Sequence, residues 1–138
     1  MAAIAFGLLF PAPVPAAGPS GSSGLIITVP VRLKEAKVVF NLYPLAFEGD
    51  EPTGLQFLRI MVKRFAIDGT KARIVAIFHD AAGYMVLDDA AYDGVRNWGQ
   101  GNPYKDQIEK LPGEGVDVEE CRVTMAANHW TNSELLPG

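Results

Sequence analysis

The pattern of apolar and polar positions predicts a strand, a helix and a second strand in succession. Lys37–Leu42 has a continuous apolar middle, which is typical of a parallel strand covered on both faces. In Leu55–Phe65 the apolar residues recur at the spacing of an amphipathic helix, which ends at Asp68 and Gly69. Ala72–Phe78 is again apolar in its middle. This succession predicts a βαβ unit, in which both strands are parallel and the crossover is right-handed.

The second half of the chain predicts one more strand among less regular segments. Ala81–Val95 is ambiguous, because its apolar residues fit a helix only in part. A short helix is expected to begin at Pro103, with Asn102 as its cap. Val116–Arg122 is expected to form the third strand, and a helix is expected to start near Thr124.

The amino end has the features of an export leader. Ala2–Phe10 is an apolar run too short to span a bilayer, and small residues suited to a signal-peptidase site follow it. Lysine and arginine are absent before Arg32, so the usual basic n-region is missing. We expect residues 1–17 to be a signal peptide, the alternative being an apolar tail. Residues 18–30 are expected to be a Gly/Ser linker and lead-in, either natural or a cloning spacer.

Composition and charge exclude several classes of function. The chain has 138 residues, 49% of them hydrophobic, with a net charge of -4, which fits one globular domain after the leader. Its basic residues are scattered, so we expect no nucleic-acid partner. The single cysteine excludes an internal disulfide, and with only two histidines we expect no metal site and no cofactor. Phosphate-loop, dinucleotide, serine-hydrolase and zinc-protease motifs are absent from the sequence.

Cys121 is the main candidate for chemistry. It falls near the carboxyl end of the third predicted strand, where open α/β sheets place reactive groups. A following helix and Arg122 would favour the reactive thiolate, whereas Glu119 and Glu120 would disfavour it. The alternative is a cysteine that is packed as a small hydrophobic residue.

Other polar residues are predicted at the same edge of the sheet. Asn41 lies near the end of the first strand and His79 ends the second, so parallel strands would bring both toward Cys121. His79 could then accept a proton and pair with the thiolate. The simpler interpretation is a strand-end histidine that makes one backbone hydrogen bond. Further candidates for lining this cleft are Tyr43, Asp80 and Asn102.

Four motifs in order resemble the DsrE/DsrF-like family, and more closely its exported, single-domain bacterial branch. They are KVVFNL at 37–42, GNPY at 101–104, EGVDVEEC at 114–121 and WTNSELLPG at 130–138. The resemblance covers residues 31–138 and implies a three-layer α/β/α sandwich around a mostly parallel sheet, assembled into trimers or hexamers. Relatives continue beyond the LPG motif with a strand, a helix and a final strand. We therefore expect 31–138 to be an incomplete domain of this type, or assembly to cover the gap.

The resemblance also implies a function in sulfur metabolism. In sulfur-oxidation and sulfur-relay members, a cysteine at this strand end accepts a persulfide sulfur and passes it on, and Cys121 matches that position. The expected protein is a periplasmic or exported bacterial sulfur carrier, at most a sulfurtransferase, with sulfur donor and acceptor proteins as partners. It would not insert into the membrane once its signal is cleaved. The alternative is a non-catalytic oligomeric binding or assembly module in which Cys121 is merely structural.

Overall fold

The computed structural model describes residues 31–43, 47–48 and 51–137. The predicted signal peptide (1–17) and linker (18–30) lie outside the described residues, so both stay predictions. From Arg32 onward the chain is one unit of mixed α/β structure. Within the described ranges no helix combines the length and the apolar character needed to cross a bilayer.

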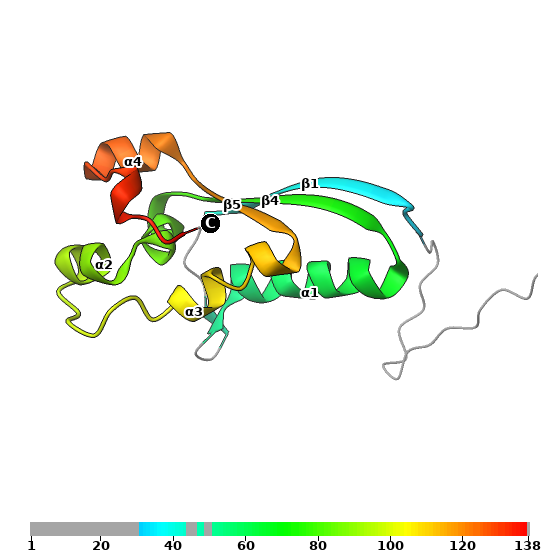
Figure 1. Ribbon diagram of the computed structural model, residues 1–138, viewed down its shortest axis with the longest axis horizontal. Helices are drawn as coiled ribbons and strands as arrows, with labels where there is room; N and C mark the ends of the chain where they lie inside the picture. Colours follow the sequence, from blue (N-terminus) through cyan, green and yellow to red (C-terminus); the bar gives the residue numbers. More distant parts are fainter. Residues whose placement is uncertain (1–30, 44–46, 49–50, 138) are drawn as a thin grey trace, which may run out of the picture. The chain divides into compact units, whose positions relative to one another are not determined.

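A parallel sheet in the order β1–β4–β5 organises the described part of the chain (Figure 1). Its strands are β1 (Glu35–Leu42), β4 (Lys71–Phe78) and β5 (Val116–Glu120). Helix α1 (Thr53–Asp68) connects β1 to β4, which confirms the predicted βαβ unit. The short antiparallel strands β2 (Phe47–Glu48) and β3 (Glu51–Pro52) precede α1.

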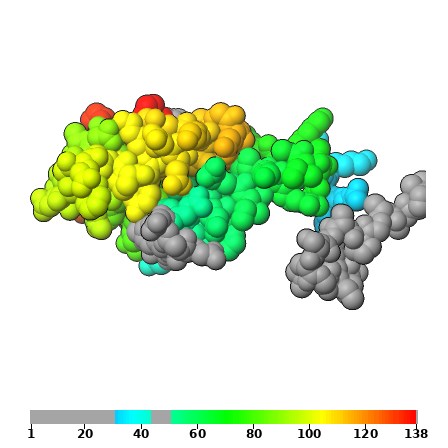
Figure 2. Space-filling view, turned by 90° about the horizontal axis from the view of Figure 1, so that it is seen from below, coloured from blue at the N-terminus to red at the C-terminus, as the bar shows by residue number. Residues whose placement is uncertain are grey.

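Helix α1 buries one row of its apolar residues on the side that faces the sheet. Leu55 and Leu58 are fully buried there, whereas the polar residues lie elsewhere on the helix. The helix ends at Gly69, whose backbone adopts φ 68°, in the left-handed region that glycine enters without steric cost. Along one flank, α1 lies beside the segment around Glu114, and residues of both line a cavity of about 560 Å³ (Figure 2).

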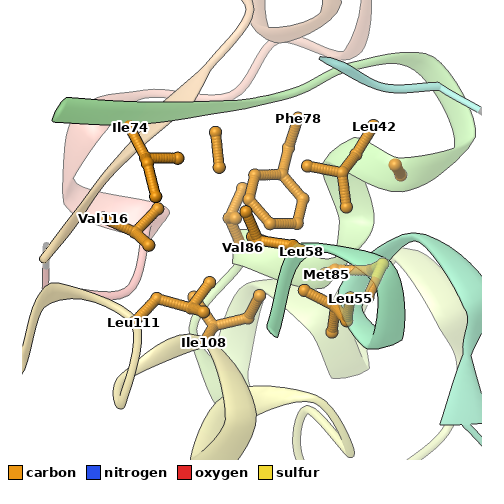
Figure 3. Close-up of a cluster of buried hydrophobic side chains, with 12 residues drawn as sticks. Leu42, Leu55, Leu58, Ile74, Phe78, Met85, Val86, Ile108, Leu111 and Val116 are labelled. Carbon is orange, nitrogen blue, oxygen red and sulfur yellow. The ribbon is translucent and has the colours of Figure 1, made fainter. Parts of the chain in front are cut away.

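The hydrophobic core lies between one face of the sheet and the elements below it. The side chains that point down from β1, β4 and β5 meet those of α1, a 3-10 helix η1 (Asp80–Val86) and α3 (Lys105–Ile108) (Figure 3). The residues labelled in this cluster are Leu42, Leu55, Leu58, Ile74, Phe78, Met85, Val86, Ile108, Leu111 and Val116.

The opposite face of the sheet, which we call the open face, is not covered by a helix among the described residues. Val39 in β1 is 68% exposed on this side, and Val75 and Ile77 in β4 are only partly buried. Lys37–Leu42 was expected to be covered on both faces, whereas the structure covers one. The described ranges therefore show an α/β fold with one helical layer, and the third layer of a sandwich stays a prediction.

The second half of the chain corrects three expectations from the sequence. The helix expected to begin at Pro103, with Asn102 as its cap, begins at Lys105 instead, and Tyr104 is the residue before it. The ambiguous stretch divides into η1 and α2 (Asp89–Arg96). The third strand ends at Glu120, earlier than predicted, and α4 (Arg122–Asn128) begins at Arg122. Val123 accordingly lies on α4 with its side chain 72% exposed. The short 3-10 helices η2 (Pro112–Glu114) and η3 (Asn132–Glu134) complete this half.

Two substitutions on opposite sides of α1 test this arrangement. Leu58→Ala should lower the free energy of unfolding by about 3 kcal/mol, because a buried leucine leaves a cavity in the core. Ile60→Ala, on the same helix at 56% exposure, should cost about 0.5 kcal/mol or less. Urea denaturation followed by circular dichroism measures both. Equal costs at the two positions would contradict the assigned core face of α1.

Candidate functional site

Cys121 lies at the junction between β5 and α4. Its backbone N–H donates a hydrogen bond to the carbonyl oxygen of Phe78, the last residue of β4, at 2.9 Å. Its own carbonyl oxygen accepts from the N–H of Met125 at 3.0 Å, as the residue before a helix does. The thiol is free and partly buried. The predicted position of the cysteine, at the carboxyl edge of a parallel sheet, is therefore what the structure shows.

The surroundings of the sulfur favour its ionised form. Backbone N–H groups at the start of α4, first that of Thr124 and then that of Val123, lower the pKa of the Cys121 thiol below its usual value. Burial acts in the opposite direction, and the Thr124 hydroxyl adds a smaller lowering effect. A partly exposed thiol with a lowered pKa has the properties of a nucleophilic cysteine.

Glu120, the residue before Cys121, is an unusual buried acid. Both of its carboxylate oxygens are buried, and neither has a hydrogen-bond partner in the described part of the chain. Burial, followed by the negative charge of Cys121, raises the pKa of Glu120 to about 8. The Cys121 N–H lowers this pKa only in part, since its hydrogen bond goes to Phe78. Glu120 is therefore mostly protonated at neutral pH.

The backbone of η1 leaves room for this carboxyl group. A β-carbon added to Gly83 would lie 2.6 Å from Glu120 Oε1 and 3.0 Å from a methyl carbon of Thr124. A larger residue at position 83 would therefore displace the carboxyl group of Glu120 from its present position. On its other side Glu120 lines a cavity of about 510 Å³, whose further lining residues are Glu119, Met125, Asn132, Leu135, Leu136 and Pro137.

His79 and Asp80 connect the end of β4 to its neighbours. The N–H of His79 donates to the carbonyl oxygen of Leu42 at 3.2 Å, and its ring lies 5.0 Å from that of Tyr43, centroid to centroid. The N–H of Asp80 donates to the Thr124 hydroxyl at 2.9 Å, with Asp80 at φ 52°. This strained turn ties the end of the central strand to α4, the helix that follows Cys121.

The structure brings most of the predicted site residues to one edge of the sheet. Asn41 and Tyr43 at the end of β1, with His79 and Asp80 after β4, share the carboxyl edge with Cys121. The side chain of Asn41 is exposed on the open face. The ring of His79 lies against that of Tyr43, and the thiol interacts with Thr124 and Val123 of α4, so a histidine–cysteine pair stays a prediction.

Asn102 has a different place in the fold. It is buried, and its side-chain amide donates hydrogen bonds to the carbonyl oxygens of Met85 at 2.9 Å and Leu87 at 2.5 Å. Its side-chain oxygen accepts from the N–H of Tyr104 at 2.9 Å. Asn102 thus fastens the loop before α3 to the end of η1, which is the geometry of a structural residue.

Glu120 was not among the site residues predicted from the sequence. The signal that could have identified it is the alternation along β5, where Val116, Val118 and Glu120 share the covered face. An acidic residue at an inward position of a strand is unusual, because a buried carboxylate is costly unless it is paired with a positive charge or protonated.

Comparison of this chain with protein-family models, with curated proteins and with solved structures finds no match. Among the residues that the structure places, there is no cluster of three or more histidine, cysteine, aspartate or glutamate side chains that could hold a metal ion. The chemistry of Cys121 and its surroundings is therefore the guide to the function of this chain.

Asn102→Ala should destabilise the fold by about 2 kcal/mol, because it leaves two buried carbonyl oxygens without their donors. Gln100→Ala, in the same loop but exposed, should change the free energy of unfolding by less than about 0.5 kcal/mol. Urea denaturation of both variants measures the difference. A neutral Asn102→Ala would show that the amide does not hold the loop in this way.

Proposed function

We propose that this chain is a sulfur carrier of the DsrE type, in which Cys121 accepts a sulfane sulfur and passes it to a partner thiol. The observation that supports the proposal most is the state of the thiol. Cys121 lies at the carboxyl edge of a parallel sheet, is partly exposed, and has a pKa lowered by the N–H groups of Thr124 and Val123. A sulfur carrier needs such a thiolate, whereas a cysteine used only for packing does not.

In the proposed step, the Cys121 thiolate attacks the outer sulfur of a donor persulfide, R–S–SH. A new S–S bond forms at Cys121 while the S–S bond of the donor breaks, and the electron pair leaves with the donor sulfur as R–S⁻. The product Cys121–S–SH then undergoes the same attack by the thiolate of an acceptor, which regenerates the Cys121 thiolate. Each step exchanges one disulfide-type bond for another, so neither an oxidant nor a cofactor is consumed.

The wider proposal follows the resemblance to the exported bacterial branch. It places the protein in the periplasm, as a trimer or hexamer with a three-layer sandwich, and makes it at most a sulfurtransferase with donor and acceptor proteins. The uncovered open face of the sheet is evidence in favour of a further layer. The exposed apolar residues of α1 are evidence in favour of assembly. These are Phe57, Ile60 and Ile67, each more than half exposed on the side away from the core.

The same exposed residues favour a second candidate function, a non-catalytic oligomeric module. In that function the apolar surface of α1 and the open face would carry the binding, and Cys121 would only pack beneath α4. The two functions differ in whether the thiol reacts with a sulfur donor.

Incubation with a persulfidated sulfurtransferase, followed by intact-mass measurement, tests the proposal. The parent protein should gain the mass of one sulfur atom in near-stoichiometric yield and lose it again to a second protein thiol. Cys121→Ser should gain none, and because Cys121 is the single cysteine, no other thiol can account for loading. An unmodified parent protein in a folded state would overturn the carrier function and leave the oligomeric module.

A further inference from the structure

We infer that the pocket between η1, α2 and the residue before α3 binds a small oxyanion through the guanidinium group of Arg96. The pocket has a volume of about 130 Å³. This is several times the roughly 30 Å³ that a water molecule occupies, and below the roughly 300 Å³ at which sites for drug-sized ligands begin. The residues that line the pocket are Ala81, Tyr84, Tyr92, Arg96 and Tyr104. It shares no lining residue with the cavity beside Glu120, and the inference goes beyond the function proposed for Cys121.

The guanidinium group of Arg96 is held at the wall of this pocket by an aromatic ring. Its central carbon lies over the ring of Tyr84, 5.0 Å from the centroid, which is a cation–π contact. Tyr84 is itself held by the buried Trp130, whose ring meets it edge-on with the centroids 5.0 Å apart. The contact with the ring leaves the N–H donors of the guanidinium free. Those planar donors match the oxygens of a carboxylate, a sulfate or a phosphate.

The acidic residues of α2 and its cap are already used within the protein. Asp93, one turn before Arg96, has the spacing for an ion pair. Its carboxylate instead accepts hydrogen bonds from two N–H groups of the following loop, at 3.0 and 3.1 Å. Asp88 caps the start of α2, and Asp89 pairs with Lys105 at 2.6 Å. Among the described residues, Arg96 therefore has no ion pair, and its charge is available to a ligand.

The tyrosines of the pocket add neutral hydroxyl groups to this charge. The rings of Tyr92 and Tyr104 meet edge to face, with their centroids 6.2 Å apart. Burial, followed by the neighbouring Tyr92, raises the pKa of Tyr104, so its phenol is protonated at neutral pH. The positive charge of Arg96 has a smaller, lowering effect on the same pKa. In the described lining there is no acidic side chain that would repel an anion.

Nitrogen-15 correlation NMR of the full chain at neutral pH measures this binding. Sodium phosphate, sodium sulfate and sodium acetate are titrated separately, each in exchange for sodium chloride at constant ionic strength. The sequence has two tryptophans, so Trp98→Phe identifies the indole N–H signal of Trp130. That signal should move saturably with at least one anion, because the ligand changes the contact between Arg96 and Tyr84, against which Trp130 packs. A response to acetate alone would assign the site to carboxylates, and a response to phosphate or sulfate would assign it to tetrahedral anions.

Three variants connect the response to the guanidinium group. Because Arg96 is exposed, solvent screens its charge, and the dissociation constant should be on the order of 1 mM. Arg96→Gln should raise it by about tenfold or more. Arg96→Lys keeps the charge but lacks the planar donors, and its dissociation constant should lie between those two values. Arg32→Gln is the matched control, since it removes one exposed charge before the amino end of β1, and it should bind as the parent does.

A Trp130 signal that moves with none of the three anions would overturn the site. The same holds for a signal that moves equally in the parent protein and in Arg96→Gln, which would leave Arg96 only its contact with Tyr84. If Arg96→Gln does not keep the parent spectrum, Arg96→Lys decides, and binding as tight as that of the parent would contradict recognition by the guanidinium group. Cys121 takes part in none of these measurements, so their outcome and that of sulfur loading are independent.

Discussion

The hydrogen bond from the Cys121 N–H to the Phe78 carbonyl oxygen is the constraint on which the site depends. It is the last bond between β5 and β4, and immediately after it the chain turns into α4. The alternation along β5 points Glu120 to the covered face of the sheet, and the turn leaves Cys121 where the first N–H groups of α4 favour a thiolate. The bond between Asp80 and Thr124 holds α4 to the end of the central strand from the other side.

The different environments of the Cys121 thiol and the Glu120 carboxyl group follow from that geometry. The thiol has backbone N–H donors that lower its pKa, whereas the buried carboxyl group has no hydrogen-bond donor among the described residues and its pKa is raised. A buried acid without a partner is expected to lower stability, and sites with such an internal conflict are commonly functional.

The sequence predicted the βαβ unit well, because the spacing of apolar residues in β1, α1 and β4 is a local signal. It predicted the end of β5 poorly. Val123 looks like a continuation of the strand, but the boundary lies earlier. It is set by the hydrogen bond from the Cys121 N–H to the Phe78 carbonyl oxygen and by the bond from the Asp80 N–H to the Thr124 hydroxyl, and Phe78 and Asp80 lie far away in the chain. The environment of Glu120 could not be predicted for the same reason. Gly83 and the residues around Asn132 are distant in the sequence and surround Glu120 only in the folded protein.

The protonation of Glu120 at neutral pH is the central claim about this site, and carbon-13 NMR of the side-chain carboxyl groups tests it most directly. The Glu120 signal, assigned by its absence in Glu120→Gln, should titrate with a midpoint at about 8, against the ordinary glutamate value of 4.5. A midpoint near the ordinary value would show that the carboxyl group is solvated and ionised at neutral pH, and would contradict the assignment of Glu120 as a buried neutral acid.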